Sequence, residues 1–225
     1  MLYDNNDLNA LRERSTAAIS DALDTITRRQ QTISPSISLL YGQRIFGPAI
    51  TIMVAATAEK AFHKVCMQTL DECEEGSVIV LAGDPDPITA AFTTTEIAIA
   101  SKRRLGGLLT DCAVRTPAVS APDAVGVAGA GRSPASGFGR IKTMALCPSS
   151  TCGGVTINQG DIIVGDHLGV VVIPTKLVHE IAVIAHRYEQ RIADMERDID
   201  VSGSLRGATD RHWKIVEAEA EGDGQ

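Results

Sequence analysis

Residues 76–115 of the chain read GSVIVLAGDPDPITAAFTTTEIAIASKRRLGGLLTDCAVR, and this stretch decides the fold. An apolar, strand-like run over 77–82 comes first, a helical pattern over 94–104 follows, and a second apolar run over 108–114 comes near the end. Alternation of strand and helix is typical of α/β proteins, in which helices cover a β-sheet. We therefore predict an α/β fold with a β-sheet core.

The patterns continue on both sides of this stretch. Upstream, the apolar spacing predicts helices over 8–30 and 58–73, with a strand over 49–54 between them. Downstream of Pro117 the spacing changes to that of short strands, which we predict over the ranges 124–128, 141–146, 154–157, 162–166 and 170–173. A long C-terminal helix is predicted over about 175–198.

The chain shows no sign of division into separate domains. No linker rich in Pro or Ser interrupts it, so we predict one domain over residues 1–225, with a core over about 15–205. The stretch 203–225 is rich in Gly, Ala, Asp and Glu, which predicts a mobile tail or an oligomer arm.

Composition argues against several classes of function. The formal net charge of −7 argues against a phosphate-neutralising surface, so we expect no direct binding of nucleic acid. No run approaches the roughly 18 apolar residues of a membrane span, and the polar N-terminus has no signal-peptide pattern. The five cysteines contain no Cys-x-x-Cys pair, which argues against zinc and favours reduced thiols. We therefore predict a cytoplasmic protein.

Arg115 and the segment Thr93-Thr94-Thr95-Glu96 point to an anion site. Arg115 follows an apolar strand, and the Thr-rich segment begins the preceding helix, with twenty residues between Thr94 and Arg115. Helix N-termini attract carboxylate and phosphate through free N–H groups, and a guanidinium matches a carboxylate. Two structural alternatives stay open: Thr93 and Glu96 also match a capping box, and Arg115 can simply reach solvent.

Other polar residues are weaker candidates for a site. Asp84 and Asp86 follow the strand over 77–82, where ligands gather in α/β sheets, but Asp residues in a Pro-rich loop also shape turns. Asp111 lies inside a strand-like run, so we expect it to be either paired or part of the site. His63 lies close to the apolar face of a helix, which favours a satisfied structural histidine.

Several blocks of the sequence resemble the RraA-like superfamily over roughly residues 15–205. The most specific blocks are 153–161 and 166–174, and the others are Ser20-Asp21-Ala22-Leu23, Gly47-Pro48-Ala49-Ile50-Thr51, 76–80 and 107–115. The superfamily includes the 4-hydroxy-4-methyl-2-oxoglutarate / 4-carboxy-4-hydroxy-2-oxoadipate aldolases and the regulator of ribonuclease E activity A. The resemblance implies a swivelling-type α/β/β/α domain with a C-terminal helix, assembled as trimers or hexamers with active sites between subunits.

The resemblance also implies roles for individual residues. Arg115 matches the arginine that holds the pyruvyl carboxylate, and Thr93, Thr94, Thr95 and Glu96 match the helix start that cradles the substrate. The family places acidic residues at the positions of Thr94 and Thr116, where the second acid positions a divalent metal, Mg²⁺ or Mn²⁺. A hydroxyl replaces a carboxylate poorly on such a metal. Glu96, Asp84, Asp111 or a neighbouring subunit could supply the missing ligand.

These implications lead to three functional hypotheses. The first is a lyase that releases pyruvate from a 2-oxo di- or tricarboxylate, by retro-aldol cleavage or by decarboxylation as with oxaloacetate, with Arg115 as anchor. The second is a non-catalytic regulator that acts by protein contact. The third is a metal-independent enzyme that acts on a carboxylate substrate.

Overall fold

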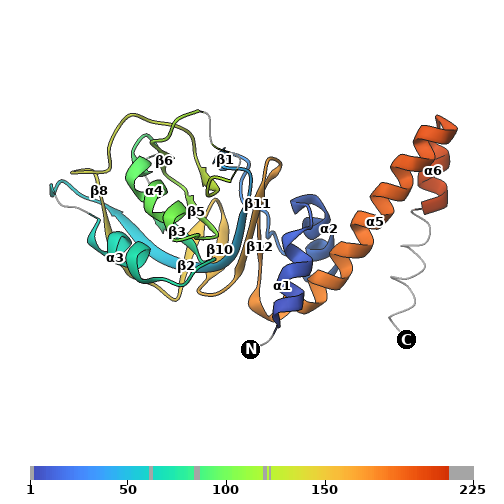
Figure 1. Ribbon diagram of the computed structural model, residues 1–225, viewed down its shortest axis with the longest axis horizontal. Coiled ribbons are helices and arrows are strands. Elements are labelled where there is room, and N and C mark those ends of the chain that lie inside the picture. Colours follow the sequence, from blue (N-terminus) through green and yellow to red (C-terminus); the bar gives the residue numbers. More distant parts are fainter. Residues whose placement is uncertain (1–2, 61–62, 84–86, 119–120, 122, 213–225) are drawn as a thin grey trace.

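The computed structural model describes residues 3–60, 63–83, 87–118, 121 and 123–212. Its main sheet has the strand order β1-β7-β5-β3-β2-β11-β12 (Figure 1). Strand β8 lies off this path and pairs with the second half of β2, which β11 does not reach. The strands of this sheet are β1 Ser38–Tyr41, β2 Ile45–Ala56, β3 Val78–Gly83, β5 Gly107–Thr110, β7 Val127–Gly129, β8 Ile141–Leu146, β11 Ile162–Asp166 and β12 Gly169–Ile173.

Within the described residues, two further strand pairs and six α-helices complete the fold. The short strands β4 and β6 pair in parallel, and β9 and β10 pair antiparallel. Their bounds are β4 Ala90–Phe92, β6 Ala113–Val114, β9 Ser149–Cys152 and β10 Val155–Asn158. The helices are α1 Asn5–Arg12, α2 Thr16–Thr27, α3 Lys64–Glu72, α4 Thr94–Lys102, α5 Val178–Ser202 and α6 Leu205–His212, with a 3₁₀ turn at Thr175–Leu177 before α5.

The main sheet is mixed and curled. Strands β2, β3, β5 and β7 run parallel, whereas β1, β8, β11 and β12 run antiparallel to their neighbours. The long strand β2 changes its partner along its length: Phe46 pairs with Val164 of β11, and Ala55 pairs with Lys142 of β8. One strand thus pairs with β11 near its start and with β8 near its end. Because β2, β3, β5 and β7 are parallel, their carboxyl ends lie at the same edge of the sheet.

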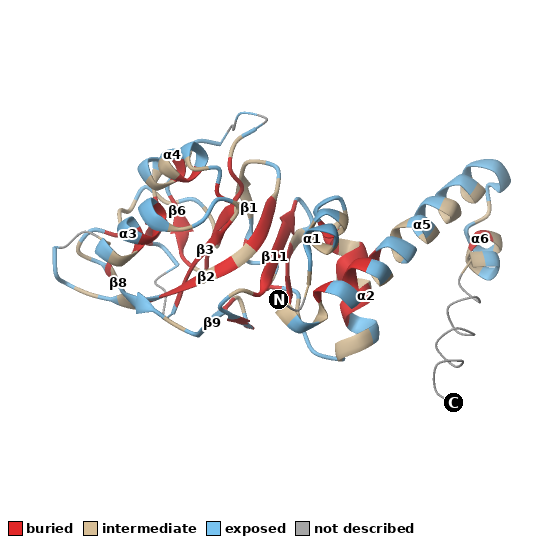
Figure 2. Ribbon diagram, turned by 60° about the horizontal axis from the view of Figure 1, so that its bottom comes forward, coloured by how far each residue is buried: buried red, intermediate tan, exposed pale blue. Residues whose placement is uncertain are grey.

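Side chains alternate between the two faces of the sheet, as the strand period of two requires. Ile79 and Leu81 pack with α3 and α4 on one face, whereas Val78 and Val80 pack with the β9–β10 hairpin on the other. A third core joins α1, α2 and α5 to β11 and β12. Figure 2 shows these buried strands beside α3 and α4, which have exposed outer faces, and beside the largely buried α2, with the exposed outer half of α5 extending away from the sheet.

The predicted α/β architecture with a C-terminal helix is confirmed, with corrections to some elements. The predicted helix over 8–30 is two helices, because the side chain of Ser15 accepts from the N–H of Ala18 and starts a new helix there. The predicted strand over 108–114 is divided, because Cys112 donates its N–H to Oγ1 of Thr110 at 3.1 Å. Strands β1, β4 and β9 were not predicted, and residues Leu205–His212 of the predicted tail form helix α6. No described helix is both long and apolar enough to cross a membrane.

Candidate active site

Arg115 lies beside the start of α4 because β6 pairs with β4. The backbone N–H of Arg115 donates to the carbonyl of Phe92 at 2.8 Å, and Phe92 directly precedes Thr93, the N-cap of α4. The Arg115 side chain is exposed. The two halves of the predicted anion site, which are far apart in the sequence, are therefore neighbours in the fold.

The polar groups of Thr93, Thr95 and Glu96 at the start of α4 are hydrogen-bonded to one another. The carboxylate of Glu96 accepts from the backbone N–H of Thr93 at 2.9 Å and from the Thr93 hydroxyl, and Oγ1 of Thr93 in turn accepts from the N–H of Thr95 at 3.4 Å. This is the capping box that the sequence left open as an alternative. Thr94, at the first helical position, is exposed. Because Glu96 already sits at the positive end of the helix, we expect Arg115 to be the main attraction for an anion here.

A cavity of about 550 Å³ lies between α3, β4, the start of α4 and the turn at 136–138. Its walls are formed by the following residues: His63, Met67, Ala90, Ala91, Thr93, Thr95, Glu96, Ser136, Gly137 and Phe138. Thr93, Thr95 and Glu96 belong to the predicted site, whereas the other lining residues were not predicted to belong to it. Since Ala91 and Thr93 flank Phe92, the cavity lies next to the backbone of Arg115.

The sequence favoured a structural role for His63, with its ring nitrogens hydrogen-bonded, and the structure differs from this expectation. It occupies the N-cap of α3 without a side-chain capping bond, and within the described part of the chain its buried Nε2 has no hydrogen-bond partner. The ring tip packs on Gly137, where an added Cβ would lie 2.7 Å from Cε1. The only sequence signal for this residue was a histidine close to an apolar helix face.

Asp111, directly after β5, and Thr116, two residues after the end of β6, each carry a buried side-chain oxygen without a hydrogen-bond partner among the described residues. Oδ2 of Asp111 accepts from the N–H of Gly83 at 3.4 Å, whereas Oδ1 is buried and finds no partner among the described residues. Burial raises the pKa of Asp111 above its usual value. Oγ1 of Thr116 is likewise buried without a described partner. Both are buried polar groups that packing alone does not explain.

The described residues do not fit a divalent-metal site. Among them, no three His, Cys, Asp or Glu side chains gather closely enough to hold a metal ion. One oxygen of Glu96 is held by the capping box, and Thr94 and Thr116 offer only neutral hydroxyls. Asp84 and Asp86, the other acidic candidates, lie outside the described residues.

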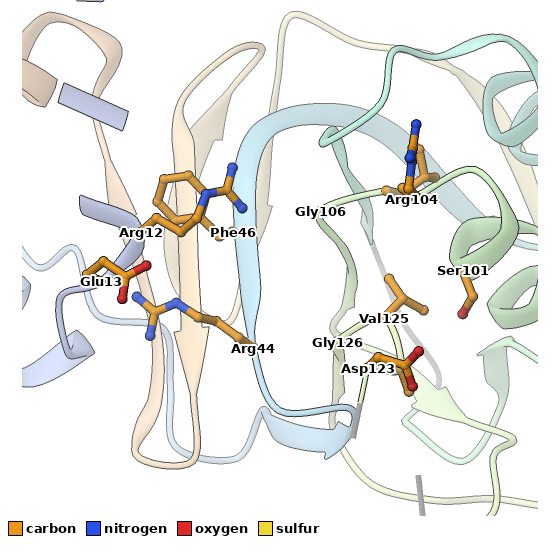
Figure 3. Close-up of a pocket in the computed structure, with 12 residues that line it drawn as sticks. Arg12, Glu13, Arg44, Phe46, Ser101, Arg104, Gly106, Asp123, Val125 and Gly126 are labelled. Atoms are coloured by element: carbon orange, nitrogen blue, oxygen red, sulfur yellow. The ribbon is translucent and has the colours of Figure 1, made fainter. Parts of the chain in front are cut away.

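A second cavity, of about 520 Å³, lies beside the first residues of β2, β5 and β7, at the opposite end of the parallel strands. Figure 3 shows the side chains around it, including Arg12, Glu13, Arg44, Phe46, Arg104 and Asp123. Nη2 of Arg44 donates to the carbonyls of Leu11 and Arg14, and Arg104 pairs with Glu75 at 2.7 Å. These arginines connect neighbouring segments of the fold, so we assign this cavity to packing rather than to the candidate site.

Comparisons with known proteins agree with this architecture. The model of the RraA-like family, described as Aldolase/RraA, matches residues 16–172. A Halalkalibacterium halodurans protein named "Putative 4-hydroxy-4-methyl-2-oxoglutarate aldolase" is 33% identical over 171 residues, which cover 74% of this chain and 76% of that protein.

Solved structures share the fold at lower identity. An uncharacterised protein from Pseudomonas syringae pv. tomato aligns with a TM-score of 0.76 at 23% identity, over 91% of this chain and 97% of that one. Streptomyces coelicolor RraAS2, described as an unusual member of the RNase ES inhibitor RraA protein family, aligns with a TM-score of 0.68 at 21% identity, over 84% and 94%. The family model and the curated relative together show that this chain belongs to the RraA-like family.

Proposed function

We propose that the protein is a carbon–carbon lyase that releases pyruvate from a 2-oxo acid, with Arg115 holding the substrate carboxylate. One observation supports the proposal: the backbone N–H of Arg115 donates to the carbonyl of Phe92, whose neighbours Ala91 and Thr93 line the cavity at the start of α4. Family membership and the H. halodurans relative support the reaction class. Retro-aldol cleavage and decarboxylation share the pyruvate enolate as product of the bond-breaking step.

The chain's own residues would act mainly by binding and orientation. In a retro-aldol step the C4 hydroxyl loses its proton, the C3–C4 bond breaks, and its electron pair forms the enolate, which then takes a proton at C3. A guanidinium at the neighbouring carboxylate fixes the substrate and offsets its negative charge as the enolate develops. The Mg²⁺ or Mn²⁺ expected from the resemblance would polarise the 2-oxo group, but the described residues do not fit it, so we assign no step to it.

A substrate panel tests the reaction class. Coupled detection of pyruvate with 4-hydroxy-4-methyl-2-oxoglutarate, oxaloacetate and smaller 4-hydroxy-2-oxo acids should give turnover with at least one of them. Measuring each in EDTA, and again after Mg²⁺ or Mn²⁺ is restored, separates a metal-dependent lyase from a metal-independent one. No pyruvate from any member, with or without metal, would contradict the lyase proposal.

A regulator that acts by protein contact is the second candidate. Thr94 and Thr116 favour it, because they stand where the aldolase pattern has acidic residues, and the net charge of −7 suits a basic partner. Binding to such a partner should weaken steeply as salt rises. In this case pull-down would succeed while the panel gives no pyruvate.

We also propose that the chain works as a single-domain homo-oligomer, a trimer or hexamer, with α5 and α6 as its arm. The support is the outer half of α5, which extends away from the sheet (Figure 1), and α6, which packs against α5. Val201 and Leu205, near the junction of the two helices, are exposed. Light scattering on the full chain and on a variant with both residues changed to Ser tests this arm.

A further inference from the structure

We infer that the substrate carries one carboxylate and an uncharged, partly apolar tail, and that Glu96 excludes a second carboxylate from the cavity beside Arg115. This inference rests on the proposed lyase function and departs from the dicarboxylates that the family resemblance implies. It follows from the charges and surfaces that line the cavity.

The cavity has an unbalanced set of charges. Its lining contains the carboxylate of Glu96 and the imidazole of His63, but no Lys or Arg among the described residues. The backbone of Arg115 lies next to Phe92, outside the lining, and its exposed guanidinium is the cation available to one carboxylate of a substrate. Within the described part of one chain, a second carboxylate that entered the cavity would lose water and face the negative charge of Glu96, with the imidazole of His63 as its only basic neighbour.

The carboxylate of Glu96 is fixed in position. It accepts hydrogen bonds from the backbone N–H and the hydroxyl of Thr93, and the hydroxyl of Thr95 donates to it at 3.2 Å. These bonds keep the negative charge from swinging away when a ligand enters. The positive end of α4, which would otherwise attract an anion, is already occupied by this side chain.

The rest of the wall favours an apolar group. Met67 of α3 and Phe138 are 48% and 42% exposed, which leaves apolar surface for a ligand tail to cover. Ala90 and Ala91 of β4 have small side chains, so they leave room for such a tail. An alkyl group in this cavity would therefore gain apolar burial without a charge penalty.

This substrate class selects one of the two proposed reactions. Decarboxylation to pyruvate needs a second carboxylate, which leaves as CO₂. A 4-hydroxy-2-oxo acid with a neutral tail can instead undergo only the retro-aldol step, in which the C3–C4 bond breaks and a neutral aldehyde or ketone leaves with pyruvate. The inference therefore favours retro-aldol cleavage.

A matched pair of substrates tests the inference. 4-Hydroxy-2-oxopentanoate and 4-hydroxy-2-oxoglutarate differ only in a methyl or a carboxylate at C5, and both release pyruvate, with acetaldehyde or glyoxylate. We expect kcat/KM to be at least about ten-fold higher for the methyl substrate. Equal or faster cleavage of the dicarboxylate would overturn the inference.

Two variants test the role of charge. Glu96→Gln keeps an oxygen that can cap α4 and removes the charge, so the preference should fall by roughly ten-fold. Met67→Lys leaves the cap intact and adds a cation, so it should shift the preference in the same direction. Glu180→Gln, an exposed change on α5 with the same effect on net charge, should not alter the ratio.

The possible outcomes separate this inference from the function on which it rests. An unchanged ratio in both Glu96→Gln and Met67→Lys, with melting temperatures near that of the wild type, would overturn the role of charge in the cavity. Pyruvate from neither substrate of the pair nor any other member of the panel would contradict the lyase proposal itself. Cleavage of the dicarboxylate alone would leave the lyase intact and overturn the substrate class.

Discussion

Asp166, the last residue of β11, holds the first turn of α2 through Thr16. Its carboxylate accepts from the backbone N–H of Thr16 at 2.9 Å and from the Thr16 hydroxyl at 2.7 Å, and both residues are buried. The N–H of Leu168 donates to the same carboxylate at 2.9 Å. One side chain thus connects a helix and a turn to the edge of the sheet, which gives part of the family-specific block 166–174 a structural purpose.

We expect Asp166→Ala to lower the free energy of unfolding by about 2–4 kcal/mol, because it leaves buried donors of Thr16 without an acceptor. Urea unfolding at neutral pH measures this change. Asp194→Ala removes an exposed carboxylate that pairs with Arg197 three residues away, and should cost less than about 0.5 kcal/mol. Equal losses in the two variants would contradict the role given to Asp166.

The same carboxylate should make stability depend on pH in the acid range. Burial raises the pKa of Asp166, but the hydrogen bonds from Thr16 and Leu168 outweigh it and leave the pKa below 3.8. The ionised form therefore stabilises the fold above the unfolded-state pKa, and this contribution disappears as pH falls through the folded-state value. Between about pH 4 and pH 2 the wild type should lose more stability than Asp166→Asn. Parallel pH profiles would contradict this assignment.

Asp111 should show the opposite pH dependence. Burial raises its pKa, and the N–H of Gly83 offsets this only in part. A raised folded-state pKa means that its favourable contribution is complete below the unfolded-state pKa and is lost as pH rises through the folded-state value. We expect Asp111→Asn to be more stable than the wild type by about 1 kcal/mol at pH 7, with no difference below about pH 4.

Chemical unfolding at both pH values tests this prediction, with the exposed Asp71→Asn as control. A less stable Asp111→Asn at pH 7 would show that the carboxylate has a partner in the fold. Stability gained together with loss of lyase activity would mark Asp111 as a residue kept for function rather than for packing.

Much of the main sheet could be predicted because its buried strands are continuous apolar runs. The run over 77–82 became β3, and the predicted helix over 94–104 became α4. The break between β5 and β6 was missed because it depends on one side-chain bond, from Cys112 to Thr110. Strand β9 was missed because its sequence SSTC has little apolar content and gains its order from pairing with β10.

The candidate site could be predicted only in part. The approach of Arg115 to the start of α4 follows from strand and helix alternation, since both lie at ends of neighbouring elements. The cavity could not be predicted, because α3, β4, α4 and the turn at 136–138 each contribute only a few of its walls. His63 and Phe138 become lining residues of a cavity only when these four segments pack together in the fold. The role of Arg115 as carboxylate anchor stays a prediction.

Arg115→Ala should lower kcat/KM for pyruvate release by roughly 30- to 900-fold, because about 2–4 kcal/mol of charge-assisted binding is lost at the transition state. Arg115→Lys keeps the charge but not the planar pair of donors, so it should recover only part of the loss. Arg104→Ala, at the opposite end of the parallel strands, is the matched control and should retain activity. Because the Arg115 side chain is exposed, its loss should change the melting temperature little. Full activity in Arg115→Ala would remove the anchor from the mechanism.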